Sequence, residues 1–67
     1  STPQIEALEK IHDETLLIDI AKNARNKYVR GQVINRINDK SVLKEIAKTD
    51  THSYNVMDAE RRLEELN

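Results

Sequence analysis

The chain has 67 residues, with 11 Lys or Arg against 12 Asp or Glu, so its formal net charge is −1. This balance argues against a dedicated nucleic-acid binder, and the absence of cysteine excludes disulfides and thiolate chemistry. A chain this short forms one domain with a small core and leaves little room for a preorganised catalytic pocket, so we expect a protein that is not an enzyme.

The composition predicts an all-α protein. One Gly, one Pro, two Tyr and no Phe or Trp leave few residues that favour strands. Hydrophobic residues make up 37% of the chain, which is too many for simple disorder. We therefore expect about five short helices that stabilise one another by packing, because isolated helices of this length are marginal in water.

The first predicted helix begins at Pro3, with Thr2 as its N-cap, because proline at the first helical position is preorganised for the turn. Its apolar side carries Ile5, Leu8 and Ile11.

The second predicted helix is capped by Asp13 and runs to about Lys22. Its apolar residues follow helical spacing and are Leu16, Leu17, Ile20 and Ala21. The polar segment 23–27 is predicted to be a loop.

The third predicted helix spans about Tyr28 to Ile37, with Val29 and Val33 on its apolar side. Gly31 lies inside it, where glycine costs about 1 kcal/mol against alanine. Either a neighbour packs tightly against this glycine or the position faces solvent, and we expect the second.

The fourth predicted helix is capped by Asp39, and a second polar loop over 49–53 separates it from a fifth helix over about Tyr54 to Leu66. The central core is expected to contain Leu17, Ile20, Val33, Ile37, Leu43, Ile46 and Leu63.

Much of this pattern recurs at an interval of twenty-six residues. The matching pairs include Ile11 with Ile37, Asp13 with Asp39, Leu17 with Leu43, Tyr28 with Tyr54, and Arg36 with Arg62. Such a period is typical of repeat architectures. We expect a single domain over 1–67, with repeat units at about 11–36 and 37–62 and partial units at both ends.

The segment Tyr28-Val29-Arg30, followed by Val33 and Ile37, resembles the second helix of HEAT-like repeats. The segment from Asp39 to Lys48, with Leu43 and Ile46-Ala47, is similar to a first helix of that family. The leucine-rich repeat variant, another short α-solenoid, is equally similar. In the second copy, Val56-Met57 departs from the Val-Arg pair, so an arginine ladder is not predicted beyond Arg30.

The HEAT-like resemblance implies an all-α, right-handed α-solenoid that serves as a scaffold or protein-interaction surface. We expect no cofactor. The partner is expected to be a protein, and the isolated domain is expected to be a monomer.

A basic stretch over residues 22–36 is the one asymmetric surface signal, because residues 20–38 contain no acid. Candidate partner-binding residues are Lys22, Arg25, Lys27, Tyr28, Arg30 and Tyr54. The cations could instead neutralise acids on neighbouring helices, and the tyrosines could pack at loop–helix junctions. A weak nucleic-acid or acidic-partner binder is the alternative function, with nucleic acid disfavoured because Arg30 and Arg36 lie on different helix faces.

The two histidines, His12 and His52, are interpreted as surface residues, because a metal site needs three or four converging ligands. Asp13 and Asp39 are interpreted as helix caps and not as catalytic carboxylates. No apolar run is long enough for a membrane span, and no signal-like segment opens the chain. Together with the lack of cysteine, this suggests a cytoplasmic location.

Overall fold

The computed structural model describes residues 3–67, apart from the side chains of Gln4 and Ile5. In this range the chain forms helices and no strand, which confirms the all-α prediction. The helices are α1 (Pro3–Glu9), α2 (Glu14–Asn23), α3 (Lys27–Ile34), α4 (Lys40–Thr49) and α5 (Ser53–Leu66). The predicted cap Thr2 and the predicted apolar contact of Ile5 lie outside the described residues.

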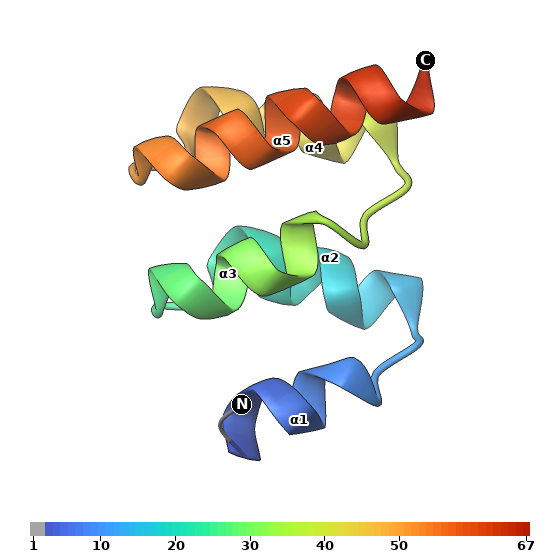
Figure 1. Cartoon of the computed structure of the whole chain (residues 1–67), viewed down its shortest axis with the longest axis vertical. Coiled ribbons are helices and arrows are strands. Elements are labelled where there is room, and N and C mark those ends of the chain that lie inside the picture. Colours follow the sequence, from blue (N-terminus) through green and yellow to red (C-terminus); the bar gives the residue numbers. More distant parts are fainter. Residues whose placement is uncertain (1–2) are drawn as a thin grey trace.

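The helices form three successive layers (Figure 1). The first layer holds α1, the second pairs α2 with α3, and the third pairs α4 with α5. Between layers, α3 contacts both α1 and α5, and α2 contacts α4. The starts of α3 and α5 therefore lie at the same edge of the molecule, on the left in Figure 1.

Side-chain caps define where three of the helices begin. The Asp13 carboxylate accepts the backbone N–H of Thr15 at 2.9 Å, and Asp39 accepts that of Ser41 at 2.9 Å, as predicted. Asn26 accepts the backbone N–H of Tyr28 at 2.8 Å and so caps α3, which the sequence interpretation did not identify. In each case the cap satisfies a backbone donor that the helix itself leaves without a partner.

The third helix is shorter than predicted, because it ends at Ile34 and not at Ile37. The backbone N–H of Arg36 donates to the Val33 carbonyl at 2.8 Å, and that of Ile37 donates to the Ile34 carbonyl at 3.2 Å. These bonds span three residues instead of four, so the chain tightens and leaves the helical path.

The core lies between the layers. Its largest fully buried side chains are Ile34, Ile37, Leu43, Ile46 and Val33. The prediction for Leu17, which is also buried, is confirmed, whereas Ile20 and Leu63 are only partly buried and pack against the core. Ile34 was not predicted, because it falls outside the i, i+4 series of Val29, Val33 and Ile37.

Two arginines make equivalent contacts between layers. Arg36 donates to the backbone carbonyls of Leu8, at 2.7 Å, and of Ile11. Arg62, twenty-six residues later, donates through Nε to the Ile37 carbonyl at 3.0 Å. Ile37 is also twenty-six residues after Ile11, so residues at the same interval in the sequence make equivalent contacts in the structure. Each arginine thereby bonds its layer to the preceding one.

Candidate functional site

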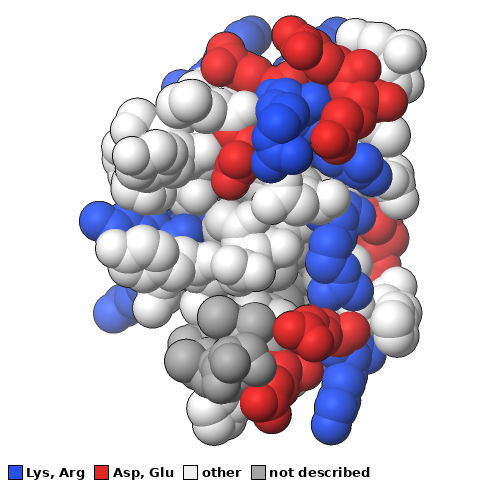
Figure 2. All heavy atoms as spheres, viewed as in Figure 1, with Lys and Arg blue, Asp and Glu red and all other residues white. Residues whose placement is uncertain are grey.

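The six predicted binding residues come from one edge of the molecule, where the loops joining α2 to α3 and α4 to α5 lie. Lys22 is in the last turn of α2, Arg25 is in the first loop, Lys27, Tyr28 and Arg30 are in α3, and Tyr54 is in α5. Figure 2 shows a largely uncharged area over the starts of α3 and α5, with basic side chains at its outer edge.

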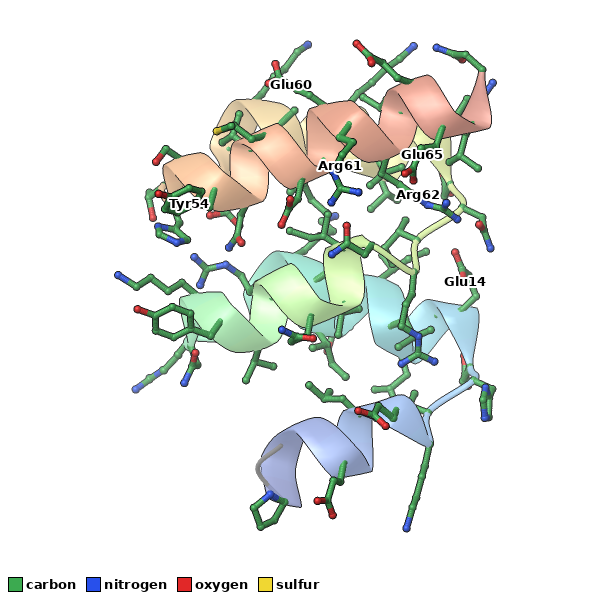
Figure 3. The ribbon with its side chains drawn as sticks, viewed as in Figure 1. Glu14, Tyr54, Glu60, Arg61, Arg62 and Glu65 are labelled. Atoms are coloured by element: carbon green, nitrogen blue, oxygen red, sulfur yellow. The ribbon has the colours of Figure 1, made fainter. Side chains whose placement is uncertain are left out.

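Three rings form an aromatic row along this edge. The ring centroid of His52 lies 6.2 Å from that of Tyr28 and 5.6 Å from that of Tyr54, both in edge-to-face contact. Tyr28 is 67% exposed and Tyr54 is 69% exposed, so neither ring is buried at a loop–helix junction. Figure 3 shows Tyr54 at the start of α5. His52 joins the tyrosines of two successive layers into one surface.

A shallow, open depression of about 410 Å³ borders Tyr28 on the surface, and we call it the basic cavity. It is lined by Arg25, Asn26, Lys27, Tyr28, Arg30 and Thr51, none of which is acidic. The Lys27 ammonium lies 5.4 Å from the centroid of the Tyr28 ring, within the range of a cation–π contact. The lining therefore combines positive charge with an exposed aromatic face.

A second cavity of about 270 Å³ lies between α3 and α5, and we call it the aromatic groove. It is lined by Tyr28, Gly31, Gln32, Asn35, His52, Tyr54, Asn55 and Asp58. Tyr28 is the one residue that lines both the basic cavity and the aromatic groove. The two cavities are thus neighbours separated by a single exposed ring.

Gly31 is required by a close approach between α3 and α5. A Cβ atom added to it would lie 2.7 Å from Asn55 Oδ1. Asn55 is buried, and its Nδ2 donates to the Lys27 carbonyl at 3.0 Å, so its side chain is held in place. The expectation that Gly31 lacks a tightly packed neighbour is therefore wrong. The sequence signal was the glycine itself, whose neighbour comes from another layer.

Arg30 connects the two loops instead of presenting its charge to solvent. Its guanidinium donates to the Asp50 carboxylate, with Nε–Oδ2 at 2.9 Å and Nη2–Oδ1 at 3.1 Å. Its Nη1 donates to the Ala24 carbonyl at 2.8 Å and to the Arg25 carbonyl at 3.2 Å. Of the predicted binding residues, Arg30 is thus the one whose contacts position the loops that carry the others.

The same contacts shift the pKa values of the pair. Burial by itself raises the pKa of Asp50, but hydrogen bonds from Arg30 and from the His52 backbone, with the Arg30 charge, outweigh it and hold that pKa below its usual value. The hydrogen bond with Asp50 raises the pKa of Arg30. Both residues are therefore charged at neutral pH.

The remaining basic residues differ in their partners. Lys22 forms an ion pair with Glu45 at 3.2 Å, so this cation does neutralise an acid on a neighbouring helix. Arg25 and Lys27 are exposed, and among residues 3–67 neither forms an ion pair. Their charge is available to a partner at the basic cavity.

The described part of the chain contains neither a group of metal ligands nor a membrane-spanning helix. There, no group of three or more His, Cys, Asp or Glu side chains is placed to hold a metal ion. His12 is exposed and His52 is partly buried within the aromatic row. Across the described helices, none combines the length and apolar character that crossing a bilayer requires.

Comparisons with protein-family models, with curated proteins and with solved structures gave no match.

Proposed function

We propose that this chain is a non-catalytic protein-interaction module, built as a right-handed HEAT-like α-solenoid, which binds an acidic segment of a partner protein. The aromatic row carries this proposal. Tyr28 and Tyr54 occupy positions twenty-six residues apart, remain about two-thirds exposed, and are joined through His52. Stacked repeats place equivalent positions in rows, and such rows are the usual binding surface of solenoids.

The solenoid part of the proposal is supported by the recurring contacts between layers. Arg36 donates to the Ile11 carbonyl and Arg62 donates to the Ile37 carbonyl, so an arginine bonds to the equivalent backbone carbonyl at both junctions between layers. The layers also follow one another in chain order, as the units of a short solenoid do (Figure 1).

Charge complementarity favours an acidic partner. Arg25 and Lys27 are exposed beside a cavity with no acidic lining, and each lacks an ion-pair partner within residues 3–67. Complementary charge raises the association rate and suppresses wrong partners. Exposed tyrosine adds contact area at low entropic cost, since tyrosine is a frequent interface anchor.

Nucleic acid is the weaker candidate. Two free cations at this edge neutralise about two phosphates, which gives a salt-dependence slope of magnitude only about 1.8 on duplex DNA. A dedicated binder spreads basic residues over a face or a groove, whereas here Lys22 and Arg30 are paired with acids within the molecule.

A titration with a fluorescein-labelled peptide of alternating Glu and Ser tests the proposal, at low and at physiological salt. We expect weak, salt-sensitive binding that falls by more than about tenfold in the Arg25→Glu/Lys27→Glu variant, because like charges repel across an interface. The matched control is Lys44→Glu/Lys48→Glu, which makes the same charge change on α4 at exposed residues that line neither cavity.

The outcomes separate the candidates. Equal losses in both double variants would show that only net charge matters and would overturn the assignment of this edge. Tighter, salt-steep binding of a DNA duplex than of the acidic peptide would replace the protein partner with nucleic acid.

A further inference from the structure

We propose that one face of α2 is a docking site for an amphipathic helix of a partner protein, which lies beside α1 and completes the first layer. The docked helix presents a small apolar residue followed by a Lys or Arg. We call this surface the α2 face, and its residues are Leu16, Asp19, Ile20 and Asn23. None of them lines the basic cavity or the aromatic groove, so the α2 face is separate from the edge that carries the proposed function.

The first layer differs from the other two because it holds a single described helix. In the second layer α2 lies beside α3, and in the third α4 lies beside α5 (Figure 1). The interval of twenty-six residues places α1 in register with α3 and α5, the second helix of each pair. Within residues 3–67, no helix lies beside α1 as α2 lies beside α3.

The contact between α2 and α4 shows what the missing helix would do. Glu45 of α4 forms an ion pair with Lys22 of α2 at 3.2 Å. Ile46 and Thr49 of α4 line a depression of about 130 Å³ together with Ala21 of α2. The second layer therefore covers α4 with a small apolar residue and the lysine that follows it.

The α2 face is the counterpart of the covered side of α4. Val42, Glu45, Ile46 and Thr49 follow the spacing i, i+3, i+4 and i+7, so they share one side of that helix. The residues twenty-six positions earlier are Leu16, Asp19, Ile20 and Asn23. The two sets match in kind, since each carries an aliphatic pair, one acid and one polar side chain.

The aliphatic pair is covered on α4 and less covered on α2. Ile46 is 2% exposed and Val42 is half-buried. By contrast, Leu16 is 44% exposed and Ile20 is half-buried. Within residues 3–67, Leu16 does not pack against the core, whereas Ile20 does. A docked helix would remove from water an aliphatic side chain that the chain's own packing leaves exposed.

The charge of the α2 face favours a basic residue on the docked helix. Asp19 occupies the position that Glu45 has on α4, where the partner is Lys22. Asp19 is exposed, and its carboxylate accepts the Asn23 Nδ2 at 2.8 Å. Among the described residues it forms no ion pair. A helix that covers α2 as α2 covers α4 therefore brings a Lys or Arg to Asp19, directly after a residue equivalent to Ala21.

The sequence of α2 itself supplies the probe, because α2 is the helix that covers the equivalent face of α4. The labelled peptide comprises residues 13–24, from the Asp13 cap to Ala24. A lactam between the side chains at positions 19 and 23 keeps it helical, since isolated helices of this length are marginal in water. These two positions lie on the side of the peptide that points away from the protein.

We expect weak binding, with a dissociation constant below about 1 mM by fluorescence anisotropy. Leu16→Ala should weaken binding about fivefold, because about half of an aliphatic side chain is no longer buried by the peptide. The matched control is Met57→Ala on α5, since Met57 is 59% exposed and lies outside the α2 face. Circular dichroism confirms that each variant is folded.

A charge exchange tests the pairing with Asp19. Asp19→Lys should weaken binding of the peptide, and Lys22→Glu in the peptide should restore it, because the opposite charges are then exchanged. Glu60→Lys makes the same charge change at an exposed residue of α5 and should have little effect. If the exchanged pair does not recover affinity, the basic residue is not recognised by Asp19 and the proposal fails.

NMR titration locates the bound peptide, and the amides of residues 16–23 should shift. The Arg25→Glu/Lys27→Glu variant should bind the peptide as the parent does, because these residues line the basic cavity. Loss of binding in that variant would place the peptide at the basic cavity and overturn the docking site, with the proposed function unaffected.

Two further results would also overturn the docking site. The first is the absence of binding at about 1 mM peptide. The second is a dimer of the chain alone, measured by sedimentation, that Leu16→Ala abolishes. Such a dimer would assign the α2 face to a second copy of this chain in place of a partner helix.

Discussion

The Arg30 guanidinium, from α3, and the Asp50 carboxylate, which follows α4, form a two-pronged ion pair between successive layers, with Nε–Oδ2 at 2.9 Å and Nη2–Oδ1 at 3.1 Å. The Arg30 side chain is 13% exposed and that of Asp50 is 3% exposed. Asp50 also accepts the backbone N–H of His52 at 2.9 Å. This one pair therefore holds the first loop, the second loop and the aromatic row in register.

Replacing Asp50 with alanine should largely unfold the chain. It leaves the Arg30 guanidinium without its counter-charge in a mostly buried position, which typically costs about 3–5 kcal/mol. A core of this size supplies only about 3–5 kcal/mol of net stability. The measurement is thermal unfolding followed by circular dichroism.

The matched control for this prediction is Asp58→Ala, which removes the partner of Arg61 in a more exposed pair. We expect a cost below about 1 kcal/mol. Similar melting of the two variants would contradict a special role for the Arg30–Asp50 pair.

Stability should fall in acid. The pKa of Asp50 is held below its usual value, as described above, and that of Asp39 is lowered chiefly by the Ser41 hydroxyl and the Val42 backbone N–H. An unfolded aspartate titrates near about 3.9. Because the folded values are lower, the contribution of both groups is complete above about pH 3.9 and is lost as the pH falls through the folded values.

Urea titrations between neutral pH and about pH 3 measure this effect. Asp39→Asn should make the free energy of unfolding depend less steeply on pH in acid. The helix stays capped, since Asn is an equally good N-cap. If the pH dependence of the unfolding free energy is the same in this variant, the Asp39 carboxylate contributes nothing to the loss of stability in acid.

Ile37→Ala should destabilise the chain by about 2–5 kcal/mol, because it opens a cavity at a fully buried position between two layers. Leu16→Ala is the control, since Leu16 is 44% exposed and its truncation should cost less than about 1 kcal/mol. Thermal or urea unfolding compares the two. If Ile37→Ala melts like the parent protein, Ile37 is not central to the core.

Gly31→Ala should destabilise the protein even though alanine favours helices by about 1 kcal/mol over glycine. The new Cβ would lie 2.7 Å from Asn55 Oδ1, and Asn55 cannot move freely because it is buried and bonded to the Lys27 carbonyl. The effect should change sign in an Asn55→Ala background, where the contact is absent. A double-mutant cycle by urea unfolding measures this coupling, and its absence would refute the close approach.

Much of the helical framework was predictable from the sequence. Asp13 and Asp39 cap helices through backbone donors two and three residues away, and such short-range bonds depend on local sequence. The apolar spacing likewise predicted Val33 and Leu43 as core residues, because helical periodicity fixes which side chains share a face.

The early end of α3 shows where local reasoning failed. Val29, Val33 and Ile37 have the spacing of a continuous helix, yet the chain tightens after Ile34. The turn brings Ile37 into the core between layers and lets Arg36 reach the carbonyl of Leu8. Tertiary burial outweighed the helical pattern only after Ile34, since Val29 and Val33 lie within α3 as predicted.

For residues 3–67, the sequence by itself determined the number of helices, the caps Asp13 and Asp39, and the interval at which residues recur, because each depends on residues close together in the chain. Only the tertiary structure decided the candidate site. The Arg30–Asp50 pair and the Gly31–Asn55 contact join residues twenty or more positions apart, and their partners are chosen by the packing of one layer on the next. That packing places Tyr28 between the two cavities, and no local pattern specifies it.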